Sequence, residues 1–237
     1  MTRYVYSYLG AAVLLLSSTV VEADGFGINA TRLIYPENES SISVTLRNTM
    51  KNNSYLVQAN VSSEQSEFIG APFFVTPPLF RLEPQSTNQV RISYKGSALP
   101  QDRESVFYFH ATGIPASSSP ASEQQTAGVS GVAQFGVGNI IKLFFRPNGL
   151  KTTSAEAQEK LTFSKVASGL EVTNTSPYFV SFASLNVAGK SVALDTPEQK
   201  MIAPFSSHIY PISTKAGDIS WQTINDVGGI DAHTRRF

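Results

Sequence analysis

The side chains that could act as general bases or metal ligands near neutral pH are His110, His208 and His233. They lie far apart in the sequence, and none has a second potential ligand at a spacing such as His-x-x-x-His. No Gly-x-Ser-x-Gly motif marks a nucleophilic serine. Gly136-Val137-Gly138 looks like part of a dinucleotide-binding loop, but the third glycine and a following helix are missing. The sequence therefore predicts no enzyme, no cofactor and no metal; a catalytic triad assembled from distant residues is the alternative.

Two cations, Lys142 and Arg146, stand in a dense apolar run, Ile140-Ile-Lys-Leu-Phe-Phe-Arg-Pro147. Taken alone, the run is typical of an ordinary strand whose lysine extends its ammonium group to water. Before it, apolar residues alternate with small or polar ones, which predicts one apolar face. The apolar set is Val129, Ala133, Phe135 and Val137.

Composition narrows the classes of function. The 237 residues include 18 basic and 18 acidic side chains and no cysteine. Zero net charge removes the electrostatic argument for binding nucleic acid or an anionic membrane. The absence of cysteine excludes disulfides, thiolate zinc sites, iron–sulfur clusters and cysteine nucleophiles. A hydrophobic content of 41% with 15% charged residues predicts a globular protein.

The N-terminus has the pattern of a secretory signal peptide. One arginine precedes an apolar and small-residue run over residues 9–21, and Val21-Glu-Ala23 offers small residues at a cleavage site. A transmembrane anchor is the alternative, but the run is short of the roughly 20 residues that span a bilayer. We expect residues 1–23 to be removed and the mature, exported chain to begin at Asp24.

After residue 24 the hydrophobic pattern is mostly of period two, which predicts half-buried antiparallel strands. Clear alternation covers residues 42–46, 55–61 and 90–94. Further strand candidates are residues 105–111, 132–145, 161–165, 170–174, 179–187, 208–212 and 219–225. Residues 154–160 are helical in pattern but too short to matter. Many short strands separated by turn residues predict an all-β protein made of β-sandwiches.

Two breaks divide the chain. Residues 116–131 are small and polar, which predicts a mobile loop. Pro147-Asn148-Gly149 is a turn cluster after a long apolar strand, and the strand pattern restarts near residue 161. We therefore expect one domain over residues 24–147 and a second over residues 148–237.

Four segments occur in a characteristic order and spacing. They are Thr76-Pro-Pro-Leu-Phe-Arg-Leu-Glu-Pro84, Leu99-Pro-Gln-Asp-Arg-Glu-Ser-Val-Phe-Tyr-Phe109, Ile141-Lys-Leu-Phe-Phe-Arg-Pro147 and Ile224-Asn-Asp-Val-Gly-Gly229. Together they resemble the periplasmic pilus (fimbrial) chaperones of the bacterial chaperone–usher pathway over nearly the whole mature chain. The resemblance implies two immunoglobulin-like β-sandwich domains in a boomerang arrangement.

The resemblance also implies site residues. Arg32 and Lys142 match the two cations that hold the C-terminal carboxylate of the pilus subunit. Val129, Ala133, Phe135 and Val137, in a strand near residues 129–145, match the residues donated to the subunit's open groove. Strict alternation places Lys142 and Phe135 on opposite faces unless a bulge near Gly138 intervenes. A third set, Glu104, Arg146 and Asp226, matches a charge cluster between the domains; three independent surface charges are the alternative.

Partners and location follow from the same resemblance. The chain is expected to act in the periplasm, to cap pilus subunits by donor-strand complementation, and to deliver them to an outer-membrane usher. No nucleic acid and no small-molecule substrate is implied. A self-capping homodimer is an alternative state of the free protein. The alternative function is a secreted immunoglobulin-like adhesin or receptor-binding module, whose binding site would lie in a surface loop.

Overall fold

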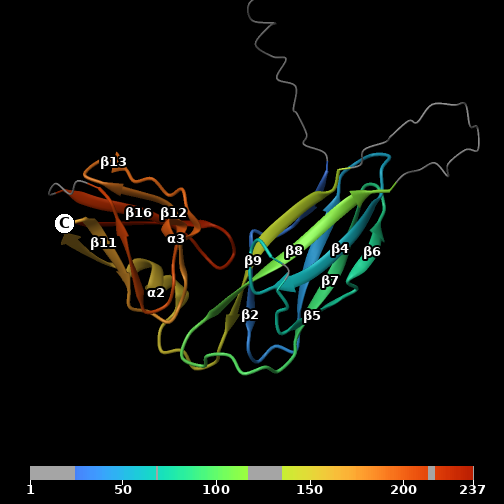
Figure 1. The fold of residues 1–237 in the computed structure, drawn as a ribbon, viewed down its shortest axis with the longest axis horizontal. Helices are drawn as coiled ribbons and strands as arrows, with labels where there is room; N and C mark the ends of the chain where they lie inside the picture. The colour runs from blue at the N-terminus through green and yellow to red at the C-terminus, as the bar shows by residue number, and fades with distance from the viewer. Residues whose placement is uncertain (1–24, 68, 117–134, 213–216, 237) are drawn as a thin grey trace, which may run out of the picture.

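The computed structural model describes residues 25–67, 69–116, 135–212 and 217–236. Strands predominate in these ranges and form two domains that meet at an angle, giving the molecule a V shape (Figure 1). Each domain contains two sheets around its own core. The predicted all-β fold with two immunoglobulin-like sandwiches is confirmed. The expected signal peptide and most of the loop over 116–131 lie outside the described residues.

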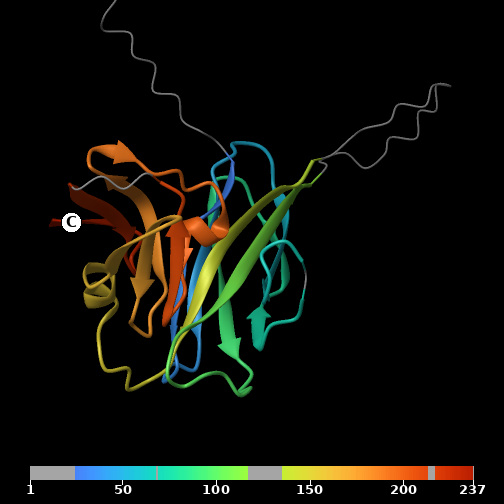
Figure 2. The same cartoon turned by 60° about the vertical axis from the view of Figure 1, so that its left-hand side comes forward.

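The first domain packs a four-stranded sheet, β1-β3-β7-β5, against a five-stranded sheet, β2-β9-β8-β4-β6. The strands are β1 Phe26–Ile28, β2 Arg32–Pro36, β3 Ile42–Asn48, β4 Tyr55–Ser62, β5 Phe73–Thr76, β6 Leu79–Leu82, β7 Ser86–Tyr94, β8 Ser105–Pro115 and β9 Val137–Arg146. Strands β8 and β9 pair along their length and run from the domain junction to the far end of the domain (Figure 2).

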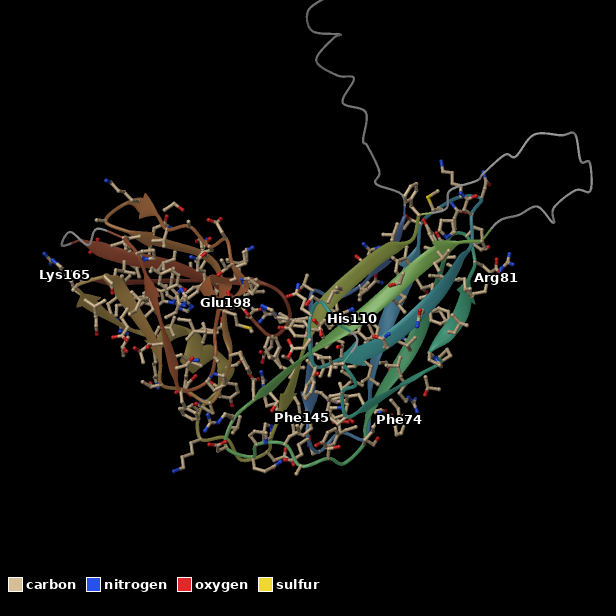
Figure 3. The ribbon with its side chains drawn as sticks, in the orientation of Figure 1. Phe74, Arg81, His110, Phe145, Lys165 and Glu198 are labelled. Carbon is tan, nitrogen blue, oxygen red and sulfur yellow. The ribbon has the colours of Figure 1, made fainter. Side chains whose placement is uncertain are left out.

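The alternating residues of the sequence fill the core of this domain. Val44, Leu46, Val57 and Ile92 are almost fully buried, while the residues between them face water or the domain surface. Phe145 lies in the same core at the end of β9, close to the second domain (Figure 3). Only the last part of β9 is therefore needed for the core of its own domain.

The second domain has a three-stranded sheet, β10-β11-β15, and a five-stranded sheet in which β13-β12-β16-β17 are neighbours and β14 pairs with β12. Its elements are α2 Ser154–Glu159, β10 Thr162–Val166, β11 Gly169–Asn174, β12 Val180–Val187, β13 Lys190–Ser191, α3 Pro197–Lys200, β14 Met201–Ile202, β15 Ser206–Tyr210, β16 Asp218–Ile224 and β17 Ile230–Arg236. Trp221 of β16 is buried at the centre, and its indole Nε1 donates to the carbonyl of Gln158 in α2 at 2.9 Å.

Three expectations need correction. The strands are not all antiparallel, because β2 pairs in parallel with β9. The strand expected over 132–145 is β9, which begins at Val137 and continues to Arg146. The helical segment over residues 154–160 was expected to be too short to matter. Helix α2 nevertheless places Ala157 in the core and accepts a hydrogen bond from the indole of Trp221. Packing against the sandwich stabilises a helix that would not form alone.

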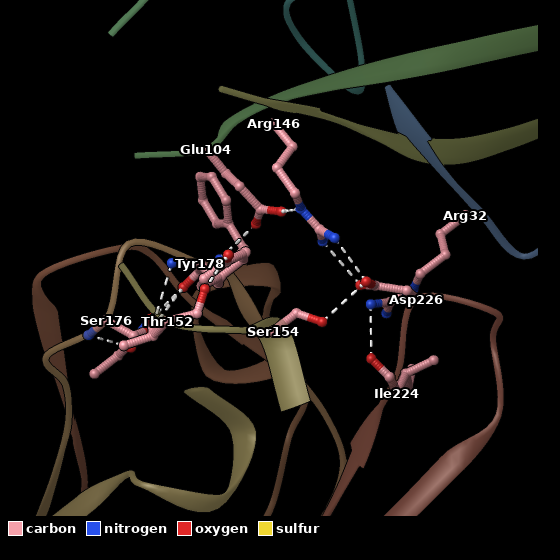
Figure 4. Close-up of polar contacts among 11 residues, drawn as sticks. Arg32, Glu104, Arg146, Thr152, Ser154, Ser176, Tyr178, Ile224 and Asp226 are labelled. Carbon is pink, nitrogen blue, oxygen red and sulfur yellow. Dashed lines mark hydrogen bonds and ion pairs between the residues drawn. The ribbon is translucent and has the colours of Figure 1, made fainter. Parts of the chain in front are cut away.

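A guanidinium joins the two domains. Arg146, the last residue of β9, donates from Nε to Oε1 of Glu104 at 2.8 Å. Its terminal nitrogens Nη1 and Nη2 donate to the carboxylate of Asp226 at 2.7 and 2.9 Å (Figure 4). Glu104 precedes β8 in the first domain, and Asp226 lies in the turn between β16 and β17 in the second. The structure thus brings together the three residues of the expected charge cluster.

The carboxylate of Glu104 is the most enclosed member of this cluster. Its side chain is 2% exposed, and Oε2 accepts a hydrogen bond from the backbone N–H of Phe179 at 2.9 Å. Burial raises the pKa of Glu104, while the charge of Arg146 opposes that rise. Burial likewise opposes ionisation of Asp226, but its hydrogen bonds with Arg146 hold its pKa below the ordinary value. We infer that this bridge fixes the angle between the domains.

Replacement of the bridging cation tests this inference. Arg146→Ala leaves Glu104 buried beside Asp226 without a cation, which is expected to destabilise the protein by about 3–5 kcal/mol. The pKa of Glu104 should rise further in the variant. The loss of stability relative to wild type should therefore be largest near pH 8. It should shrink as the pH falls toward 5 and Glu104 is protonated.

Thermal melts across this pH range and limited proteolysis near Pro147 measure the effect. Arg91→Ala, at an exposed position of β7, is the matched control. Equal melting temperatures and equal cleavage for Arg146→Ala and wild type would show that the three charges do not act as a unit.

Candidate functional site

Arg32 and Lys142 lie side by side on neighbouring strands. They are Cα partners in the parallel ladder between β2 and β9. The next residues of each strand, Leu33 and Leu143, are buried in the core of the first domain. Because side chains alternate along a strand, Arg32 and Lys142 both project from the other face of the sheet. The structure therefore places the two expected anchor cations together, on the face toward the second domain.

The guanidinium of Arg32 is held in place but not fully bonded. Its Nη1 donates to the carbonyl of Ile224 in β16 at 2.7 Å (Figure 4), and it lies 5.5 Å from the ring centre of Phe144. Its Nε is buried without a hydrogen-bond partner in the described part of the chain. Burial lowers the pKa of Arg32, against the opposing charges of Asp226 and Glu104. One donor of this cation is thus available for an acceptor.

The ammonium group of Lys142 has no hydrogen bond and no ion pair among the residues that the structure describes. Burial lowers its pKa to about 8, and repulsion from Arg32 and Lys200 lowers it in the same direction. Burying an unpaired ammonium is unfavourable. An anion that binds beside Lys142 would relieve that cost.

These groups line a pocket of about 230 Å³ between the domains. The first domain contributes Arg32, Lys142 and Tyr108, and the second contributes Ser181 and Lys200. No acidic side chain is among its lining residues. The pocket is therefore suited to a small anion such as a carboxylate. The sequence alone did not point to Ser181 or Lys200, because only the domain angle brings them to this pocket.

A larger hollow of about 470 Å³ lies at the linker between the domains. Its walls carry both signs of charge, with Asp102 and Glu156 opposed by Lys151 and Lys160. It therefore has no preference for an anion, and none of the expected anchor, donor-strand or charge-cluster residues lines it. Within the described ranges there is no group of three or more potential metal ligands, and no helix is long and apolar enough to cross a membrane.

The first half of β9 has an open edge. Strand β9 pairs with β8 over Val137–Phe145, but with β2 only over Lys142–Arg146. Over residues 137–141, the edge away from β8 has no strand partner among the described residues. The β8–β9 pairing has no register shift, so no bulge occurs near Gly138. Val137 and Lys142 therefore lie on opposite faces of β9.

Large apolar side chains are exposed along this open segment. Phe135, just before β9, is 81% exposed, and Val137 and Ile140 are each 45% exposed. An unpaired strand edge with exposed apolar residues is a site for pairing with another chain. Two further residues of the expected donor strand, Val129 and Ala133, lie outside the described residues.

Both domains match models of one protein family. The family model of the N-terminal domain of PapD, a pili and flagellar-assembly chaperone, matches residues 25–151. The model of the C-terminal domain of the pili assembly chaperone PapD matches residues 156–235. The probable fimbrial chaperone protein ElfD of Escherichia coli K12 is 36% identical over 221 residues, which are 92% of this chain and 89% of the relative.

Solved structures are similar over both domains. The E. coli chaperone DraB is 34% identical with a TM-score of 0.74, and the match covers 91% of this chain and 97% of DraB. The structure of the Salmonella enterica SafA pilin in complex with the SafB chaperone matches at 27% identity and a TM-score of 0.74, over 91% of this chain and 98% of that one. This chain belongs to the family of pili assembly chaperones.

Proposed function

We propose that this protein is a periplasmic chaperone that holds pilus subunits by two contacts and delivers them to an outer-membrane usher. The first contact is an anchor for the subunit's C-terminal carboxylate at Arg32 and Lys142. The second is a strand, donated from the segment before and within the first half of β9. The observation that carries the proposal is that the partly buried ammonium of Lys142 and the adjacent Nε of Arg32 have no hydrogen-bond partner among the described residues.

The anchor works by charge and desolvation. A carboxylate that enters the pocket loses hydration, and charge-assisted hydrogen bonds of roughly 1.5–3 kcal/mol each offset that loss. Lys142 gains the counter-charge that it lacks in the free protein. Burial sets the useful pH range by lowering the pKa of Lys142, and the charges of Arg32 and Lys200 lower it further. Binding should weaken as the pH rises above about 8 and Lys142 becomes neutral.

The anchor also sets the position of the donated strand. Val137 is five residues from Lys142 in one uninterrupted strand, a span of roughly 17 Å at 3.3–3.4 Å per residue. A carboxylate fixed at Lys142 therefore determines which subunit residues face Val137 and Phe135. Since a slip of one residue would turn every side chain to the other face, this anchoring favours one pairing register.

The donated strand meets two needs of a subunit whose sandwich lacks a strand. Its open edge supplies backbone hydrogen bonds, and its apolar side chains fill the exposed groove. Burial of each large side chain is worth roughly 1.5–3 kcal/mol. A second copy of the chain could pair with the same edge in the free protein, which would give a self-capped homodimer.

Family membership supports the remaining parts of the proposal. Transfer to an usher, and release when the next subunit's strand displaces the chaperone strand, are inferred from that membership. So is the periplasmic location. The family match also favours this function over the adhesin alternative, because it covers both domains.

The anchor is tested by Lys142→Met, which keeps an apolar stem and removes the charge. With a pilus subunit co-expressed, the variant should fail to protect the subunit from degradation, and Arg32→Ala should fail likewise. The free variant should melt at a higher temperature than wild type near pH 7, because the unpaired buried cation is gone. Wild type should gain stability as the pH rises from about 8 to 10.5, where only the unfolded chain keeps the lysine proton.

The variant should lack this pH-dependent gain. Lys165→Met, at an exposed position of β10, is the control for a lost surface charge. Subunit levels in the periplasm and thermal melts are the two measurements. Wild-type subunit levels with Lys142→Met would contradict the anchor.

The donated strand is tested by Phe135→Ser and Val137→Ser. Both side chains are exposed in the free protein, so the melting temperature should change little while subunit capture falls strongly. Phe74→Ser, at an aromatic residue of β5 that is 61% exposed, should change neither. If Phe135 and Val137 instead served the core of this protein, the same changes would destabilise it by about 2–5 kcal/mol. That result, without a specific loss of capture, would overturn the donor role.

A further inference from the structure

Ser181 of β12 has a buried hydroxyl group on the side of the strand away from the domain core. It is 3% exposed, and its Oγ has no hydrogen-bond partner in the part of the chain that the structure describes. Val180 and Phe182 on either side belong to the core of the second domain. Alternation therefore turns Ser181 away from that core, and it lines the pocket that holds Arg32 and Lys142.

An orphaned hydroxyl at this position indicates a missing acceptor. A buried donor without a partner costs about 1–3 kcal/mol. Within the described ranges, the Nε of Arg32 is a second buried donor without a partner in the same pocket, and the ammonium group of Lys142 is also unpaired. A carboxylate has about four acceptor positions, enough for all three groups. Donors from both domains thus surround one pocket and lack the same kind of ligand.

Lys200 brings a third positive charge to the pocket from the second domain. It ends α3 and directly precedes Met201, the Cα partner of Ser181 in the pairing of β14 with β12. Helix α3 lies on the side of the second domain that faces the first, as the label of Glu198 in Figure 3 shows. Lys200 also lines the pocket, and its charge acts on Lys142. Its exposed side chain can attract an anion before the anion is bound.

We propose that the second domain completes the carboxylate site, with the hydroxyl of Ser181 donating to the bound carboxylate and Lys200 attracting it. This inference rests on the proposed function and extends it, because the carboxylate then bridges both domains. The two residues act differently. Ser181 contributes a short-range hydrogen bond that should slow dissociation, and Lys200 contributes a long-range charge whose effect depends on salt.

The test uses the full chain and a synthetic probe. The probe is an N-acetylated hexapeptide of alternating valine and threonine with a free C-terminal carboxylate, compared with the same peptide as a C-terminal amide. Affinities are measured by NMR titration at pH 7. Wild type should bind the carboxylate form more tightly. Ser181→Ala should weaken binding of that form about tenfold, the equivalent of one charge-assisted hydrogen bond, and leave binding of the amide unchanged.

Matched variants separate a binding role from a structural one. Ser181→Thr keeps the hydroxyl and should retain carboxylate binding. Ser184→Ala, at a half-buried position of the same strand that does not line the pocket, should leave carboxylate binding unchanged. A structural role for Ser181 would lower the melting temperature of Ser181→Ala, whereas removal of an unpaired hydroxyl should leave it equal or higher. Lys200→Met should weaken carboxylate binding at low salt and have little effect at high salt, and Lys190→Met should not.

The outcomes also separate this inference from the proposed function. If Ser181→Ala and Lys200→Met bind the carboxylate form as wild type does, while Lys142→Met loses the preference, the second domain does not take part and the anchor stands. If Lys142→Met also keeps the preference for the carboxylate, or if wild type has none, the anchor itself is wrong and this inference fails with it.

Discussion

The guanidinium of Arg146 is the contact on which the cleft depends. Arg146 is the last residue of β9, and its guanidinium binds one carboxylate from each domain, those of Glu104 and Asp226. Because the carboxylate of Glu104 is buried, the bridge cannot open without leaving an uncompensated charge away from water. The same strand carries Lys142 four residues earlier, so the junction positions one face of β9 against the second domain. Both domains can then line one pocket.

That pocket is unfavourable for the free protein. Among the residues that the structure describes, Lys142 has no partner for its ammonium group, and Arg32 and Ser181 each keep a buried donor unbonded. Proteins that keep such groups usually do so at functional sites, where a ligand supplies the missing partner. The open edge and the exposed apolar residues before and within the first half of β9 likewise lack a partner among the described residues. Both features are costly in the free chain, and the proposed subunit, with a carboxylate end and an incomplete sheet, would relieve both.

The sequence patterns predicted the strands that bury one face in a domain core. The strands containing Val44, Val57 and Ile92 alternate with period two because one side of each packs in the core. Strand β17 was missed because it is an edge strand with mostly exposed residues, so no apolar alternation marks it. Strand β2, the parallel partner of β9, was also missed, because its three central residues, Leu33, Ile34 and Tyr35, are all apolar or aromatic and show no alternation. Resemblance to a family pointed to Arg32 and Lys142, but only the folded domain angle brings Ser181 and Lys200 beside them.

The central claim is that the cleft holds an unpaired cation for a subunit's carboxylate, and the protonation of Lys142 reports on it directly. An NMR titration of the Lys142 side chain, in the free protein and in a complex with a pilus subunit, measures its pKa in both states. The account predicts a pKa of about 8 in the free protein and a clearly higher pKa in the complex, because a bound carboxylate stabilises the charged form. An unchanged pKa on subunit binding would contradict it.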